Sequence, residues 1–216
     1  MTTTVLLADD HNVMREGLRR LLEGTDGIRV VGDVADGRDA VRVAKENCPD
    51  VVVMDVTMPG LNGVEATRQI RAALPKTKVL ALSMHTDGQF VTEMLKAGAS
   101  GYLLKTCVVD EQELAIRAVN SGKVYLGPEI GPVLAEIYIG KSAGTDAPGV
   151  SLTRRQREIL QLIAEGLTTK QIARQLARSA KTIEMHRRHL MEKLNLHGVA
   201  DLTKYAIRRG LTSLDA

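Results

Sequence analysis

The first 120 residues alternate between short runs rich in β-branched and other apolar residues and longer stretches with apolar residues at helical spacing. The short runs, which indicate strands, are residues 5–8, 28–34, 51–54, 79–82 and 101–104. The longer stretches, which indicate amphipathic helices, are residues 13–22, 38–46, 64–73, 90–97 and 111–120. Because a helix follows each strand, right-handed crossovers place helices on both faces of a parallel sheet. The expected fold class is therefore α/β, with a doubly wound, five-stranded parallel sheet.

A change of composition separates this part of the chain from a smaller, basic part. Residues 140–150, GKSAGTDAPGV, offer little to bury and several residues that disfavour regular structure. Residues 1–140 carry 15 Lys+Arg and 19 Asp+Glu, a net charge of −4, whereas residues 141–216 carry 14 and 7, a net of +7. This pattern favours a regulatory or cation-binding domain joined to a polyanion-binding module, with chance segregation of surface charge as the alternative.

Composition also narrows the class of protein. Aromatic residues are 2% of the chain, which disfavours a single-strand binder that stacks bases. The two cysteines, Cys48 and Cys107, have no CxxC spacing, so neither a disulfide scaffold nor a cysteine-ligated zinc is expected. No apolar run approaches the ~20 residues of a membrane span, and the N-terminus has no signal-peptide pattern. We expect a cytoplasmic protein without a membrane partner.

Polar side chains follow four of the five predicted strands. Asp9 and Asp10 end the first, Asp55 the third and Ser83 the fourth, and the fifth runs into Lys105. The carboxyl ends of parallel strands share one edge, where such sheets bind ligands. Clustered carboxylates repel unless a cation offsets their charge, and oxygen ligands suit Mg²⁺ or Mn²⁺. The Ser83 hydroxyl and the Lys105 ammonium suit a phosphoryl group, which makes Asp55 a candidate phosphoryl acceptor.

The basic part has the pattern of a helix-turn-helix. Capping boxes at Thr153/Gln156 and Thr168/Gln171 predict two helix starts, and Ser179 caps a longer helix that ends near Leu194. In that last helix Arg187, Leu190 and Leu194 fall on the inner side, with Glu158 or a DNA phosphate as candidate partners of Arg187. The outer side carries residues suited to phosphates and base edges: Lys181, Glu184, Met185 and Arg188, flanked by Thr182 and His189.

These motifs resemble two known domains. Ala-Asp9-Asp10, Met-Asp55-Val-Thr-Met-Pro-Gly, Leu-Ser83 and Gly-Tyr102-Leu-Leu-Lys105 resemble the flavodoxin-like receiver domain of two-component response regulators, over roughly residues 4–122. The segments 152–166, 170–173 and 181–194 resemble the LuxR-type DNA-binding domain. Together they resemble a NarL/FixJ-family response regulator. The expected organisation is a receiver domain at 1–122, a linker at 123–150 with a helix at 128–139, and a DNA-binding domain at 151–216.

For the receiver domain, the resemblance implies phosphoryl transfer to Asp55 from the phosphohistidine of a sensor histidine kinase. Asp10, Asp55 and the backbone carbonyl of Thr57 would ligate Mg²⁺ or Mn²⁺, with Asp9 acting mostly through water. Lys105 and Ser83 would contact the phosphoryl oxygens, and Tyr102 would follow Ser83 inward as a switch. Beyond phosphorylation and dephosphorylation of its own Asp55, the chain is not expected to be an enzyme.

For the DNA-binding domain, the resemblance implies binding of double-stranded DNA as a homodimer on two half-sites after activation. Bases would face Glu184, Met185 and Arg188, and phosphates would be held by Lys170, Lys181, Thr182 and His189. Where the family often has a second cation this chain has Glu184, which suits a cytosine amino group. The last helix, 199–209, would pair with its twin through Leu202, Tyr205 and Ile207, and RNA polymerase is a candidate partner.

Two other functions stay open at this point. A magnesium phosphatase of the aspartyl-phosphate type uses a similar pocket, but it needs a nucleophilic Asp at the first strand with a second Asp two residues later. A receiver that only dimerises and is never phosphorylated is the other, although the full set of polar residues disfavours it. The chain departs from many receivers at Thr106, where they have proline, and Cys107 is expected to be a packed thiol rather than a redox group.

Overall fold

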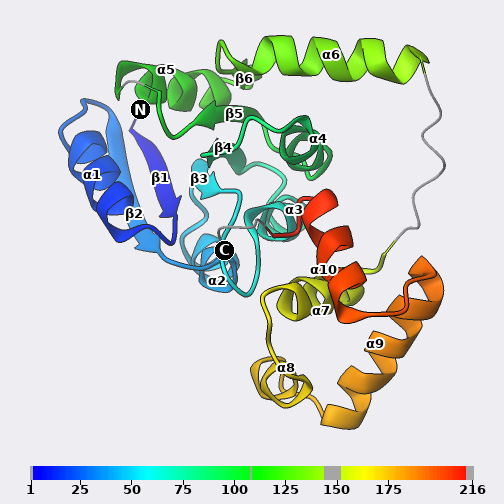
Figure 1. Cartoon of the computed structure of the whole chain (residues 1–216). Coiled ribbons are helices and arrows are strands. Elements are labelled where there is room, and N and C mark those ends of the chain that lie inside the picture. The colour runs from blue at the N-terminus through cyan, green and yellow to red at the C-terminus, as the bar shows by residue number, and fades with distance from the viewer. Residues whose placement is uncertain (1, 108, 144–151, 213–216) are drawn as a thin grey trace. The chain divides into compact units, whose positions relative to one another are not determined.

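The computed structural model describes residues 2–107, 109–143 and 152–212. The chain divides into two compact units, residues 1–143 and 144–216 (Figure 1). The buried apolar side chains of each unit pack among themselves. None of the described helices combines the length and the apolar character needed to cross a membrane.

The first unit is built on a parallel sheet with the strand order β2-β1-β3-β4-β5-β6. The strands are β1 (Thr3–Ala8), β2 (Ile28–Val34), β3 (Val51–Asp55), β4 (Lys78–Ser83), β5 (Gly101–Leu104) and β6 (Tyr125–Leu126). The helices between them are α1 (Asn12–Glu23), α2 (Gly37–Asn47), α3 (Gly63–Ala73), α4 (Gly88–Lys96) and α5 (Val109–Asn120). The predicted α/β class and doubly wound parallel sheet are confirmed, with helices on both faces (Figure 1).

The structure corrects the number of strands from five to six. The added strand, β6, has only two residues, and it pairs Tyr125 with Gly101 and Leu126 with Tyr102 of β5. Two residues are too few to produce a recognisable periodic pattern, since strands are identified from four or more. β6 is a strand because the edge of β5 is there to pair with it, which is a tertiary condition.

Neighbouring residues of the strands point to opposite faces and fill two separate cores. Leu6 and Met54 pack on one face with the apolar sides of α2, α3 and α4. Val5, Leu7 and Val53 pack on the other face with α1 and α5. Because both faces are covered, the open carboxyl edge of the sheet is where polar side chains meet.

The loop between β3 and α3 folds closely against the end of β3. The backbone N–H of Gly63 donates to the Val56 carbonyl at 2.9 Å, and the Asn62 side chain caps α3 by accepting from the Glu65 N–H. A β-carbon on Gly63 would lie 1.8 Å from the Asp55 carbonyl oxygen. Glycine at this position therefore lets the loop turn back directly beside Asp55.

The segment after the sheet contains a further helix, α6 (Ile130–Ala143). It packs on the start of α4, where a β-carbon on Gly88 would lie 2.7 Å from the Ile137 side chain and 3.3 Å from that of Val133. Ile130 is fully buried, whereas Tyr138 and Ile139 are exposed. The helix expected at 128–139 thus has a counterpart inside the first unit, and it runs to Ala143, into the stretch that was expected to disfavour regular structure.

The second unit consists of α7 (Arg154–Ala164), α8 (Thr169–Gln175), α9 (Ala180–Leu194) and α10 (Val199–Arg208). Both predicted capping boxes are confirmed, at Thr153/Gln156 and at Thr168/Gln171, and Ser179 caps α9 by accepting from the Thr182 N–H. The four helices enclose one core, which includes Leu160 of α7, Ile183 and Leu190 of α9, and Leu202 of α10. Local caps thus set the helix starts, and the buried stripes hold the helices together.

Candidate functional site

Three strands of the first unit bring opposite charges together in a buried pocket. Asp9 follows β1, Asp55 ends β3, and Lys105 follows β5. The Lys105 ammonium lies 2.7 Å from Asp55 Oδ2 and 2.8 Å from Asp9 Oδ2, and all three residues are buried. The predicted meeting of these side chains at the carboxyl edge of the sheet is what the structure shows. One buried ammonium thus faces two buried carboxylates, which leaves a net negative charge.

Burial raises the pKa of Asp55 to about 7, and the neighbouring carboxylate of Asp9 adds to this effect. The Lys105 ammonium opposes the increase, because its charge and its hydrogen bond favour the ionised carboxylate. An ionised Asp55 at neutral pH therefore depends on positive charge beside it. A cation held beside the carboxylates would favour the ionised form of Asp55.

The donor set of the pocket fits a divalent cation. Asp9, Asp10, His11 and Asp55 each offer a ligand atom, and these atoms lie within 4.8 Å of one another. Asp9 Oδ2 and Asp10 Oδ1 are buried and make no hydrogen bond of good geometry, although the first lies 2.8 Å from the Lys105 ammonium and the second 3.0 Å from His11 Nδ1. Buried carboxylate oxygens that accept no hydrogen bond are costly, and a bound cation would offset that cost. The Thr57 N–H donates to Asp55 Oδ1 at 3.3 Å, so Thr57 lies at the rim of this pocket.

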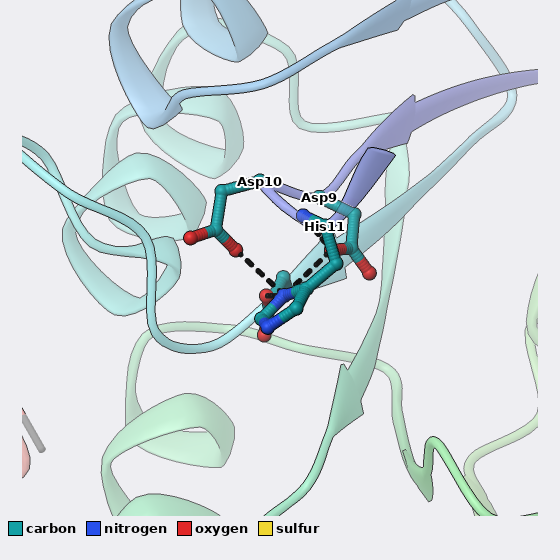
Figure 2. A group of neighbouring side chains, drawn as sticks. Asp9, Asp10 and His11 are labelled. Carbon is teal, nitrogen blue, oxygen red and sulfur yellow. Dashed lines mark hydrogen bonds and ion pairs between the residues drawn. The ribbon is translucent and has the colours of Figure 1, made fainter. Parts of the chain in front are cut away.

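His11 belongs to this pocket, and sequence reasoning missed it. Its Nδ1 lies 3.0 Å from Asp10 Oδ1, 3.3 Å from Asp9 Oδ1 and 3.3 Å from Lys105 Nζ. Figure 2 shows its imidazole between the two aspartates. The signal available in the sequence was its position directly after the acidic pair. A lone polar residue before a helix is also typical of an exposed cap, so that position alone does not single out a pocket residue.

Ser83 and Tyr102 are linked through the loop after β4. The Ser83 hydroxyl accepts from the backbone N–H of His85 at 3.0 Å, and the Tyr102 hydroxyl donates to the His85 carbonyl at 2.9 Å. Both Ser83 and Tyr102 are fully buried, and burial raises the pKa of Tyr102 to about 12. The His85 ring stacks on Phe90 of α4 at 4.7 Å. His85 therefore contacts Ser83, Tyr102 and α4, and a movement of Ser83 would reach the other two through it.

A largely apolar cavity of about 620 Å³ lies beside the pocket. Its lining includes Val13, Met14 and Leu18 from α1 together with Met84 and Cys107. Burial raises the pKa of the Cys107 thiol, which therefore ionises less readily than a free cysteine. This agrees with the expected packed thiol. The peptide bond between Lys105 and Thr106, where many receivers have proline, is trans.

In the second unit, α9 turns the predicted outer residues to its surface. Lys181, Glu184, Met185, Arg188 and His189 are exposed, and so is Lys170 on α8. Thr182 is half-buried, because its hydroxyl and backbone N–H both bond to Ser179. Arg187 is half-buried beside a cavity of about 100 Å³. The Glu158 carboxylate, one of its two candidate partners, accepts from Arg155 at 2.6 Å.

The structure changes the expected dimer contacts of α10. Leu202 is fully buried in the core of its own unit, where α10 packs on α7, so its side chain is not available to a second chain. Tyr205 and Ile207 are half-buried, and the Arg209 guanidinium lies over the Tyr205 ring at 5.4 Å. Leu202 is thus a core residue rather than an interface residue, and only Tyr205 and Ile207 stay in the predicted dimer face.

Two family models match the chain. The response regulator receiver domain covers residues 5–118, and the bacterial regulatory proteins of the luxR family cover residues 150–206. Among curated relatives, the response regulator UvrY of Escherichia coli K12 is 40% identical over 98% of this chain and 96% of its own. The oxygen regulatory protein NreC of Staphylococcus carnosus is 37% identical over 96% and 98%.

The chain is also similar to solved structures of response regulators. A LuxR-family two-component response regulator from Aurantimonas sp. SI85-9A1 is 40% identical and covers 64% of this chain and 99% of its own, with a TM-score of 0.62. RcsB from Salmonella enterica serovar Typhimurium, bound to promoter P1flhDC in the presence of the phosphomimetic BeF3⁻, is 26% identical over 98% of this chain and 100% of its own, with a TM-score of 0.62. The chain belongs to the NarL/FixJ family of two-component response regulators, DNA-binding regulators of transcription in which a receiver domain precedes a LuxR-type helix-turn-helix domain.

Proposed function

We propose that phosphorylation of Asp55 by a sensor histidine kinase controls how this response regulator binds DNA. The observation that carries the proposal is the buried Asp55 carboxylate 2.7 Å from the Lys105 ammonium, at the open carboxyl edge of the sheet. In the transfer, a carboxylate oxygen of Asp55 forms a bond to phosphorus while the bond from phosphorus to the kinase's histidine nitrogen breaks. The kinase docks at the apolar cavity beside α1, where Val13 is exposed.

Asp10, Asp55 and the backbone carbonyl of Thr57 would hold Mg²⁺ or Mn²⁺, with Asp9 contributing through water. The ion supplies positive charge to the phosphoryl oxygens when it is bound. On the chain itself, Lys105 holds a phosphoryl oxygen from the opposite side, and the Ser83 hydroxyl donates to another. Lys105 stabilises the charge that develops during transfer, because it is already in place in a buried pocket.

The switch runs from Ser83 through His85 to Tyr102. Movement of Ser83 toward the phosphoryl group breaks its present bond to the His85 N–H and lets the loop after β4 shift. The His85 carbonyl, which accepts from the Tyr102 hydroxyl, moves with that loop. Phe90, which stacks on His85, passes the change to α4. The altered surface promotes a homodimer, in which Tyr205 and Ile207 of α10 meet their twins. The phosphoryl group shifts the equilibrium between the inactive and the active conformation only by the difference in its interaction free energy with the two.

In the second unit, α9 enters the major groove of double-stranded DNA. Glu184, Met185 and Arg188 face base edges, while Thr182, His189, Lys181 and Lys170 contact phosphates. The exposure of α9's outer side and the burial of Ile183 and Leu190 support this orientation. A dimer predicts two half-sites related by a twofold axis. The regulator acts in the cytoplasm, where RNA polymerase is a further partner.

Phosphorylation of Asp55 is tested by incubating the full chain with Mg²⁺ and acetyl phosphate, a small phosphoryl donor. The modified peptide is then identified by mass spectrometry. We expect a phosphoryl group on the peptide that contains Asp55 and none on Asp55→Asn. The phosphorylated sample is expected to run as a dimer in light scattering. A phosphoryl group on another residue, or none on the wild type, would refute the proposal.

DNA recognition is checked with a site selected from random sequence and the pair of variants Arg188→Ala and Lys181→Ala. Loss of a base contact at Arg188 is expected to cost about 1–3 kcal/mol and to relax the preference at one base pair. Loss of a phosphate contact at Lys181 is expected to weaken binding to all DNA sequences similarly. It is also expected to lower the slope of log affinity against log salt concentration by about 1. The measurement is binding affinity across a salt series on the selected and a scrambled site. If Arg188→Ala behaves like Lys181→Ala, Arg188 does not read a base.

A further inference from the structure

The imidazole of His11 faces the interior of the acidic pocket although most of the side chain is exposed. Its Nδ1 lies 3.0 Å from Asp10 Oδ1, 3.3 Å from Asp9 Oδ1 and 3.8 Å from Asp55 Oδ2. Ligand atoms around a six-coordinate ion at about 2.1 Å lie roughly 3 Å from their nearest neighbours. Nδ1 and Asp10 Oδ1 thus already have the spacing of neighbouring ligands in one coordination sphere. Figure 2 shows the His11 ring between Asp9 and Asp10.

Two polar neighbours of His11 Nδ1 require opposite hydrogen-bonding roles of that atom. The Lys105 ammonium at 3.3 Å can only donate, so it requires a lone pair on Nδ1. The Asp10 carboxylate at 3.0 Å can only accept, so it requires a proton on the same atom. A divalent cation between the ring and the carboxylates would take the place of that proton and leave the Nδ1 lone pair free to ligate.

The backbone holds His11 in this position. Its N–H donates to Asp9 Oδ1 at 2.8 Å, and its carbonyl accepts from the Arg15 N–H at 3.0 Å as α1 begins. The side chain of His11 is 62% exposed, whereas those of Asp9 and Asp55 are nearly inaccessible. The imidazole therefore stands on the solvent side of the carboxylates, where it can meet an ion that arrives from water.

We propose that His11 is a nitrogen ligand of the ion in this pocket, and that it shifts the pocket's preference from Mg²⁺ toward transition-metal ions such as Co²⁺. Mg²⁺ takes oxygen ligands and keeps its waters, whereas imidazole suits ions later in the transition series. The inference rests on the proposed metal-assisted phosphorylation of Asp55. It adds that metal choice depends on a residue that lies outside the acidic set.

The experiment measures binding of Mg²⁺, Mn²⁺ and Co²⁺ to the full chain by isothermal titration calorimetry, for wild type, His11→Ala and His11→Asn. We expect both variants to lose about tenfold or more of the Co²⁺ affinity, because a ligand is removed. The Mg²⁺ affinity is expected to change by less than about twofold. Electron spin echo measurements on bound Mn²⁺ are expected to show nitrogen coupling in the wild type and none in either variant.

The control is His197→Ala, which removes an exposed histidine from the second unit and is expected to leave the affinity of the pocket for each ion unchanged. Thermal melts show whether the two His11 variants are folded. Tighter binding of every ion by His11→Ala would overturn the inference, since His11 would then compete with the metal. Equal changes for Co²⁺ and Mg²⁺ would overturn it as well. A wild type that binds no divalent ion at all would overturn both this inference and the metal part of the proposed function.

Discussion

Replacing Lys105 with alanine is expected to slow phosphorylation of Asp55 by about 10²- to 10³-fold, the usual loss when one preorganised group that stabilises transition-state charge is removed. The ammonium lies 2.7 Å from Asp55 Oδ2 and is almost fully buried, so water does not replace it well. Its removal also leaves the carboxylates of Asp9 and Asp55 facing each other without it. The measurement is the initial rate of phosphorylation by acetyl phosphate and Mg²⁺, which avoids any effect on kinase docking.

A matched control is Lys96→Ala, which removes the same charge from the exposed end of α4. Lys96 lies 3.5 Å from Glu93 in solvent, and surface ion pairs of this kind contribute little. We expect its phosphorylation rate to equal that of the wild type. If Lys105→Ala is phosphorylated as fast as Lys96→Ala, the ammonium does not assist transfer, and its role is limited to pairing with Asp55.

The second large effect is on stability: Gly63→Ala is expected to destabilise the first unit by about 3 kcal/mol. The new methyl group would lie 1.8 Å from the Asp55 carbonyl oxygen and 2.8 Å from its carbonyl carbon. Backbone atoms of a central strand cannot move aside as a flexible side chain can, so the loop must open. The measurement is urea unfolding followed by circular dichroism, with the transition of the second unit as an internal reference.

Gly17→Ala gives the opposite expectation and serves as the control. Gly17 lies within α1, and nothing is found within 4 Å of a β-carbon placed there. Alanine in an open helix position is expected to stabilise by about 0.5–1 kcal/mol, because glycine loses more backbone freedom on folding. Equal effects of the two substitutions would show that the loop after Asp55 yields to the added methyl group, and Gly63 would then not be needed to hold Thr57 beside Asp55.

Local patterns in the sequence were enough to predict most of the secondary structure and the chemistry of the pocket. Strand and helix periods, together with capping boxes such as Thr153/Gln156, depend on residues only a few positions apart. The meeting of Asp9, Asp55 and Lys105 also followed from sequence, because parallel strands share one carboxyl edge. That geometric rule holds for any order of the strands in the sheet.

Other features depend on what lies across space, and no local pattern reports them. Tyr125 and Leu126 form a strand only because β5 offers them an unpaired edge. The Tyr102 hydroxyl meets the His85 carbonyl because β5 and the loop after β4 are neighbours in the fold. His11 was missed for the same reason, since its three carboxylate neighbours include Asp55, which comes from another strand.

The sequence by itself determined that two units exist, that one ends its strands in aspartates, a serine and a lysine, and that the other is a basic helix-turn-helix. The tertiary structure decided which apolar faces meet. The stripe of α10 is amphipathic in the sequence, but Leu202 packs into its own unit rather than onto a second chain. Periodicity shows that a face must be buried and does not show against what, because burial depends on the surface that reaches it.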